Sequence, residues 1–122
     1  MLVGLGGFLG SGLRYVLSSW AQRTLVLGGF PIGTLTVNVL GCLLIGYLGG
    51  LAEQRQFMES GVRLFLLVGV LGGFTTFSTF SLEMFTMLNQ GRWMLAIGYS
   101  VSSVVLCVLV TWLGLRAGQM MQ

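Results

Sequence analysis

Residues 72–81 read Gly-Gly-Phe-Thr-Thr-Phe-Ser-Thr-Phe-Ser and lie inside the third of four long apolar segments. Two glycines open the run, five of the next eight residues carry hydroxyls, and Phe74, Phe77 and Phe80 recur at every third position. Glycine loosens a helix, and inside a membrane an opened helix is tolerated only where it lines a cavity or meets a ligand. The run therefore indicates an ion path or, since Gly, Ser and Thr also pack membrane helices, a helix contact.

The composition is that of an integral membrane protein. Of the 122 residues, 55% are hydrophobic and 7% are charged, whereas a soluble domain has about 25% charged residues. The pattern predicts an all-α, single-domain chain, residues 1–122, that crosses a lipid bilayer several times. We expect this bilayer to be the cell (inner) membrane. Transmembrane helices are expected at about 2–20, 32–52, 62–88 and 93–115, the third broken near 72–76.

The inventory of reactive side chains argues against an enzyme. The chain has no histidine and only three acidic residues, so acid–base partners for hydrolysis are missing. Cys42 and Cys107 lie in apolar segments, and two thiols without histidine are too few for a structural zinc site. The six basic residues are dispersed arginines, which does not indicate nucleic-acid binding.

The distribution of arginines favours insertion in both orientations. Arg23 and Arg92 fall on one side of the membrane, and Arg55, Arg63 and Arg116 fall on the other. Three against two is a weak orientation signal under the positive-inside rule. Because four helices can hardly enclose a pore of their own, we expect a twofold homodimer, with antiparallel subunits if both orientations occur.

Several polar residues lie within the apolar segments. Arg14 either lines a water-filled vestibule or extends its side chain to the interface. Thr34 and Asn38 are four residues apart and share a helix face, where the Asn38 amide offers donors to an ion path or an interhelical hydrogen bond. Glu83 falls toward the far end of the third segment.

Regular spacings of four residues mark two further features. Tyr99, Ser103, Cys107 and Thr111 form one polar stripe on the fourth segment, which faces either a pore or another helix. The pairs Gly6/Gly10 and Gly69/Gly73 predict close helix contacts.

The polar groups inside the membrane are mostly hydrogen-bond donors, which suit an anion. The edges of phenylalanine rings carry partial positive charge and suit an anion too. Neutral donors and ring edges can replace part of an anion's hydration without trapping it, as conduction requires. The residues thus predict a narrow, weakly charged anion path.

Three motifs resemble those of one family. Residues 72–83 look like the signature of the Fluc (CrcB) fluoride channels, residues 33–41 resemble its second-helix motif, and residues 6–15 match its N-terminal pattern. The resemblance covers essentially the whole chain. It implies a fluoride-selective channel, built as an antiparallel homodimer with two pores, that passively exports cytoplasmic fluoride and so lowers its toxic level.

The resemblance also implies roles for individual residues. A structural sodium ion would be held at the dimer interface by the backbone carbonyls of Gly72 and Thr75. Arg14 maps to a vestibule arginine and Glu83 to an acidic residue near the pore mouth. Cys107 occupies a position where the family suggests a hydroxyl, and Phe74 is assigned to packing. The fluoride path maps to Phe77, Phe80, Asn38, Thr34, Tyr99 and Ser103.

The alternative is a cation/proton exporter of the small multidrug-resistance type, which shares length, helix number and dual topology. Such an exporter needs an embedded glutamate in its first segment. This chain has Arg14 there and no acidic residue before Glu53.

Overall fold

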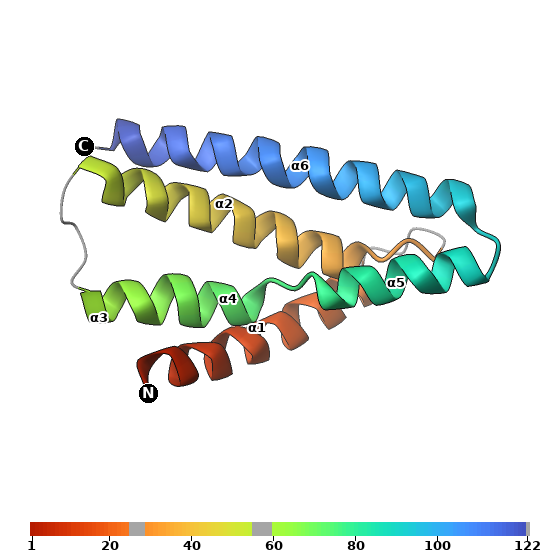
Figure 1. Cartoon of the computed structure of the whole chain (residues 1–122), viewed down its shortest axis with the longest axis horizontal. Helices are drawn as coiled ribbons and strands as arrows, with labels where there is room; N and C mark the ends of the chain where they lie inside the picture. Colours follow the sequence, from red (N-terminus) through yellow and green to blue (C-terminus); the bar gives the residue numbers. More distant parts are fainter. Residues whose placement is uncertain (25–28, 55–59, 122) are drawn as a thin grey trace.

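The computed structural model describes residues 1–24, 29–54 and 60–121, and every regular element within these ranges is helical. Figure 1 shows an elongated bundle in which both termini lie at the same end. The elements in chain order are α1 (Leu2–Thr24), α2 (Ile32–Gln54), α3 (Ser60–Arg63), the π-helical η1 (Leu64–Leu71), α4 (Gly72–Phe74), α5 (Ser78–Asn89) and α6 (Trp93–Met120).

The bundle consists of two helix pairs of opposite direction (Figure 1). α2 and α6 run parallel to each other and form the most extensive helix contact. α1 runs beside η1 and α4 in the other direction and meets α2 near the start of that helix. The broken third segment therefore lies between α1 and the α2–α6 pair.

The predicted glycine contacts are confirmed where α1 meets η1 and α4. Gly6, Gly10 and Gly69 are buried. A Cβ atom on Gly69 would come within 2.9 Å of the Gly6 Cα, and one on Gly73 within 2.7 Å of the Gly7 carbonyl oxygen. The two backbones touch, so a side chain cannot be added at these positions without moving a helix.

The third segment is broken, but its glycines do not open it. Gly72 is helical (φ −62°, ψ −39°), and the chain first becomes extended at Thr75 (φ −88°, ψ 153°) before α5 begins at Ser78. The expected break at 72–76 therefore lies at 75–77. Gly73 serves helix packing, and both the N–H and the hydroxyl of Thr75 donate to the Leu71 carbonyl, each at 3.0 Å, at the point where α4 ends.

Three described helical segments are long and apolar enough to cross a membrane: Ile32–Leu51, Gly61–Asn89 and Trp93–Met120. α1 has 23 residues but is not among them, since it contains many glycines and two arginines. α1 and α6 also extend past their expected ends at residues 20 and 115, because a helix need not stop at the last apolar residue. Arg55 lies outside the described residues.

Candidate functional site

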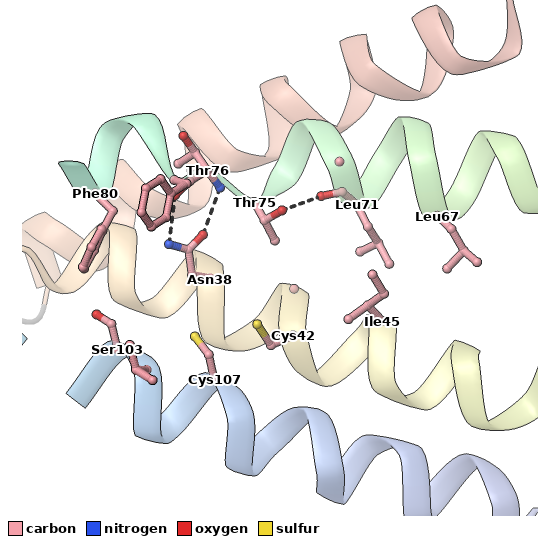
Figure 2. A pocket seen from close by; sticks show the side chains of 14 residues that line it. Asn38, Cys42, Ile45, Leu67, Leu71, Thr75, Thr76, Phe80, Ser103 and Cys107 are labelled. Carbon is pink, nitrogen blue, oxygen red and sulfur yellow. Dashed lines mark hydrogen bonds between the residues drawn. The ribbon is translucent and has the colours of Figure 1, made fainter. Parts of the chain in front are cut away.

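Asn38 on α2 holds the break in the third segment. Its Nδ2 donates to the Thr76 carbonyl at 3.1 Å, and its Oδ1 accepts the Thr76 N–H at 3.0 Å (Figure 2). One side-chain amide thus replaces the helical partners of both backbone groups of one residue, Thr76. The interhelical hydrogen bond predicted as one alternative for Asn38 exists, and its partner is backbone.

At the break, two backbone N–H groups bond to side-chain oxygens instead of to the carbonyls that they would bond in a regular helix. The Thr76 N–H, which would bond the Gly72 carbonyl, goes to Asn38. The Thr79 N–H, which would bond the Thr75 carbonyl, goes to the Thr76 hydroxyl at 3.3 Å. Gly72 and Thr75 are the two residues whose carbonyls were expected to bind sodium, and both lose their regular helical donors.

Three cavities surround this segment. The break cavity, of about 390 Å³, lies between the opened helix, α2 and α6 (Figure 2). The vestibule, of about 750 Å³, lies near the end of α1, and the connecting cavity, of about 160 Å³, lies between Arg14 and the hydroxyls of the break. Thr34 lines both the vestibule and the connecting cavity, and Thr76 lines both the connecting cavity and the break cavity. The three spaces are therefore neighbours.

Arg14 lines the connecting cavity and is half-buried. Thr34, Thr76 and Thr79 line the same space. α1 continues to Thr24, ten residues beyond Arg14, so the side chain lies further from the helix end than the sequence suggested. Arg14 does not line the larger cavity named the vestibule but the smaller cavity connected to it, and both predicted alternatives for this side chain stay predictions.

Glu83 and Tyr99 each have a buried oxygen atom that lacks a well-formed hydrogen bond. The Thr34 hydroxyl donates to Glu83 Oε1. Glu83 Oε2 and the Tyr99 hydroxyl are buried near each other, and neither makes a hydrogen bond of ordinary geometry within the part of the chain that the structure describes. Buried polar atoms of this kind ordinarily bind water or an ion. Glu83 also lines the vestibule, and its expected place near a pore mouth stays a prediction.

The aromatic side chains form a shorter series than their spacing suggested. The ring centroids of Phe77 and Phe80 are 5.5 Å apart, and Phe80 lies 5.0 Å from Tyr99. Phe74 is separated from them by the break and is 7% exposed, which agrees with a packing role. Phe77 is 76% exposed at the break cavity.

The fourth-helix residues differ in their surroundings. Ser103 and Cys107 line the break cavity. Tyr99 is fully buried in the cluster with Leu35, Met87 and Ala96, and it lines none of the three cavities. Its participation in a fluoride path stays a prediction.

Sequence analysis did not single out several residues of the site. Thr76 and Thr79 lie in the hydroxyl-rich run, but their partners depend on where the helix opens. Ser18 lines the vestibule and the connecting cavity, and its spacing of four from Arg14 was a usable signal. Cys42 lines the break cavity opposite α6.

Comparison with known proteins identifies the family. A family model described as CrcB-like protein, Camphor Resistance (CrcB), matches residues 1–115. A Methylobacillus flagellatus protein named fluoride-specific ion channel FluC is 44% identical over 98% of this chain and 94% of its own length. Proteins of that name from Nitratidesulfovibrio vulgaris and Magnetococcus marinus are 42% and 46% identical, over 98% and 97% of this chain and 96% and 95% of their own lengths.

These relatives are named as ion channels, not as enzymes or multidrug exporters, so the exporter alternative is not favoured. The resemblance carried by the three motifs is confirmed. With three long apolar helices, the chain is a multi-pass membrane protein, and it belongs to the CrcB-like family.

Proposed function

We propose that this chain is a fluoride-selective channel that lets cytoplasmic fluoride leave the cell passively. One observation carries the proposal: in a chain whose relatives are named fluoride-specific channels, neighbouring cavities that each contain hydroxyl or amide groups meet at a break in a membrane helix. Membrane helices open in this way where they line a path or hold an ion.

The donors along these cavities suit a small anion. Asn38 uses one N–H on Thr76, and its amide has a second N–H for an ion in the break cavity. Ser103 adds a hydroxyl to the same cavity. Thr34 has one hydroxyl proton and donates it to Glu83. Its hydroxyl can therefore donate to fluoride only if it first breaks the hydrogen bond to Glu83. Arg14 attracts anions toward this series of donors.

We propose four membrane spans for each chain. α1, with 23 residues, is about 35 Å long at 1.5 Å per residue, which exceeds a hydrocarbon core of about 30 Å. Its glycine contacts with the third segment keep it inside the bundle.

We propose that two chains assemble as an antiparallel homodimer. The break cavity is bordered by the exposed Phe77, Val104 and Ile45, so one chain leaves it open at its surface. A second copy would cover these side chains and close the path. Reporter tags at both ends of the chain, read for accessibility in cells, test the orientation, and a single orientation for all molecules would contradict it.

Sodium is proposed as a structural ion at the break. Carbonyl oxygens are hard ligands that suit a hard cation. Gly72 and Thr75 fit this role because the N–H groups that would serve their carbonyls are bonded elsewhere. Both residues also border the break cavity. The ion would fix the opened backbone and would not enter the transport step.

The direction of transport follows from acid–base chemistry. Hydrogen fluoride crosses membranes as a neutral weak acid and dissociates in a more alkaline cytoplasm, which traps the anion. An inside-negative potential then favours anion exit by about 2.3 kcal/mol per 100 mV. A passive path is sufficient.

Ion efflux from liposomes that carry the purified protein tests the function. Liposomes loaded with fluoride and chloride are monitored with an electrode for each ion. We expect rapid loss of fluoride with retention of chloride. Loss of both ions would overturn the selectivity, and retention of both by correctly assembled protein would overturn the channel.

A further inference from the structure

α2 and α6 contact each other in a fixed register that pairs residues along their length. A Cβ atom on Gly46 would meet the backbone oxygen of Thr111, and one on Gly50 would meet that of Leu115. Both contacts advance by four residues on each helix. One turn earlier in the same register are Cys42 on α2 and Cys107 on α6. The contact of the backbones therefore brings the only two cysteines of the chain face to face.

The two thiols lie close enough to interact directly (Figure 2). Both side chains are half-buried, and both line the break cavity beside Asn38 and Ser103. They are unoxidised in the structure. Nothing in the proposed fluoride path requires sulfur at either position.

We propose that Cys42 and Cys107 form a binding site for one soft, two-coordinate metal ion, of the kind represented by Hg²⁺, held between α2 and α6. Soft thiolate ligands select soft cations. Two sulfurs on facing helices supply both ligands of a two-coordinate complex from elements whose register is already fixed. The second metal–sulfur bond then forms within one molecule, which strengthens binding by about 10² or more over a single thiol.

The charge balance suits a membrane interior. Each thiol loses its proton when its sulfur bonds to the metal, so HgCl₂ releases two chloride ions and two protons leave the protein. The product, one Hg²⁺ bonded to two thiolates, is neutral, and a neutral group is the least costly species to hold in an apolar environment.

The same geometry excludes zinc. Zinc prefers four ligands. Within residues 1–24, 29–54 and 60–121, no third His, Cys, Asp or Glu joins a cluster with the two cysteines. The site should therefore discriminate between two metals of equal charge by the number of ligands they require.

Binding is measured on the purified protein in detergent by titration with HgCl₂, with mercury–thiolate ultraviolet absorbance and protection of thiols from maleimide as readouts. We expect one Hg²⁺ per chain with both thiols protected, and no protection by Zn²⁺. In a competition with a small thiol, the variants Cys42→Ser and Cys107→Ser should each lose mercury at a thiol concentration about 10²-fold lower than the unsubstituted protein requires. Two ions per chain, or single variants that hold mercury equally well, would overturn the shared site.

The site borders the cavity of the proposed fluoride path, so a second measurement rests on the proposed function. HgCl₂ should reduce fluoride efflux from liposomes at least tenfold (about 1.4 kcal/mol), and excess dithiothreitol should restore it. Each single variant, compared with its own metal-free flux, should resist the metal. Stoichiometric mercury without inhibition would overturn the placement beside the path. Protein that binds one Hg²⁺ per chain but never conducts fluoride would overturn the channel and leave the metal site standing.

Discussion

The contact between α2 and α6 differs between the two halves of this helix pair. In the half near Asn38 and Ser103, side chains face a cavity of about 390 Å³. In the half around Gly46, Gly114 and Gly118, the two backbones touch, because a Cβ atom on any of these glycines would overlap the backbone of the other helix. One half is open and carries a few polar groups on a largely apolar wall, and the other is closed and without intervening side chains.

The difference shows how a thin bundle keeps open a cavity into which a few hydrogen-bonding groups point. Hydrogen-bond donors that line a cavity can no longer reach a partner inside it if the helices slide past each other or close together. The glycine contacts fix both separation and register of α2 against α6, and the α1–η1 contact does the same for the third segment. The cavity residues are thus positioned by contacts one or two helical turns away.

The largest effect is expected from Asn38→Ala. The substitution removes the partners of the Thr76 N–H and the Thr76 carbonyl, and two unpaired, part-buried backbone groups cost together about 2–4 kcal/mol. The break should rearrange and fluoride efflux should fall below detection. Efflux from liposomes and thermal unfolding in detergent measure the two consequences.

Thr36→Ala is the matched control, since Thr36 lies on the same helix and borders none of the three cavities. It should leave efflux within about twofold of the unsubstituted protein, as expected for a position away from such features. Full flux in Asn38→Ala would mean that the break stands without its side-chain partner.

A second substitution tests the closed half. In Gly46→Ala the added Cβ meets the Thr111 backbone and forces α2 and α6 apart, which should destabilise the fold by about 1–3 kcal/mol. The same change at Gly49, three residues along α2, meets nothing within 4 Å. Unfolding of both variants in detergent gives the comparison. Equal stability would show that the two helices can separate at no cost.

Sequence reasoning predicted the long apolar helices, and most of the residues that it named border the cavities around the break, while their roles stay predictions. Composition and segment length predict the spans, because the bilayer dictates both. The break near 72–76 was predicted only approximately, because Gly72 and Gly73 pointed to the start of that range and the chain opens at 75–77. The opening depends on Asn38 reaching Thr76, a contact between residues 38 positions apart. The register that pairs Cys42 with Cys107 is likewise set by the contact between two helices, so it could not be predicted from either helix alone.

Phe80→Ile tests the ring edges of the open half. Phe80 lies between Phe77 and Tyr99, with centroids 5.5 and 5.0 Å away. A branched aliphatic side chain keeps apolar volume but loses the partially positive edge. Fluoride efflux should fall about tenfold, or about 1.4 kcal/mol, while the dimer stays intact by gel filtration. Phe85→Ile, at an exposed ring on the same helix, is the control. Full flux in an intact Phe80→Ile dimer would refute the ring-edge role.

The smallest expected effect on efflux comes from a comparison of two hydroxyl groups, those of Ser103 and Thr111, in the polar stripe of α6. Ser103 faces the break cavity, whereas the Thr111 hydroxyl donates to the Cys107 carbonyl of its own helix at 2.7 Å. Ser103→Ala removes a donor to the ion and should lower efflux several-fold, as one hydrogen bond of about 1 kcal/mol predicts. Thr111→Val keeps the shape, removes only a local bond and should leave efflux unchanged. Initial efflux rates at equal protein density measure both. If the two variants lost equal flux, the open half and the closed half would share one function, and α6 would present its whole polar stripe to the ion.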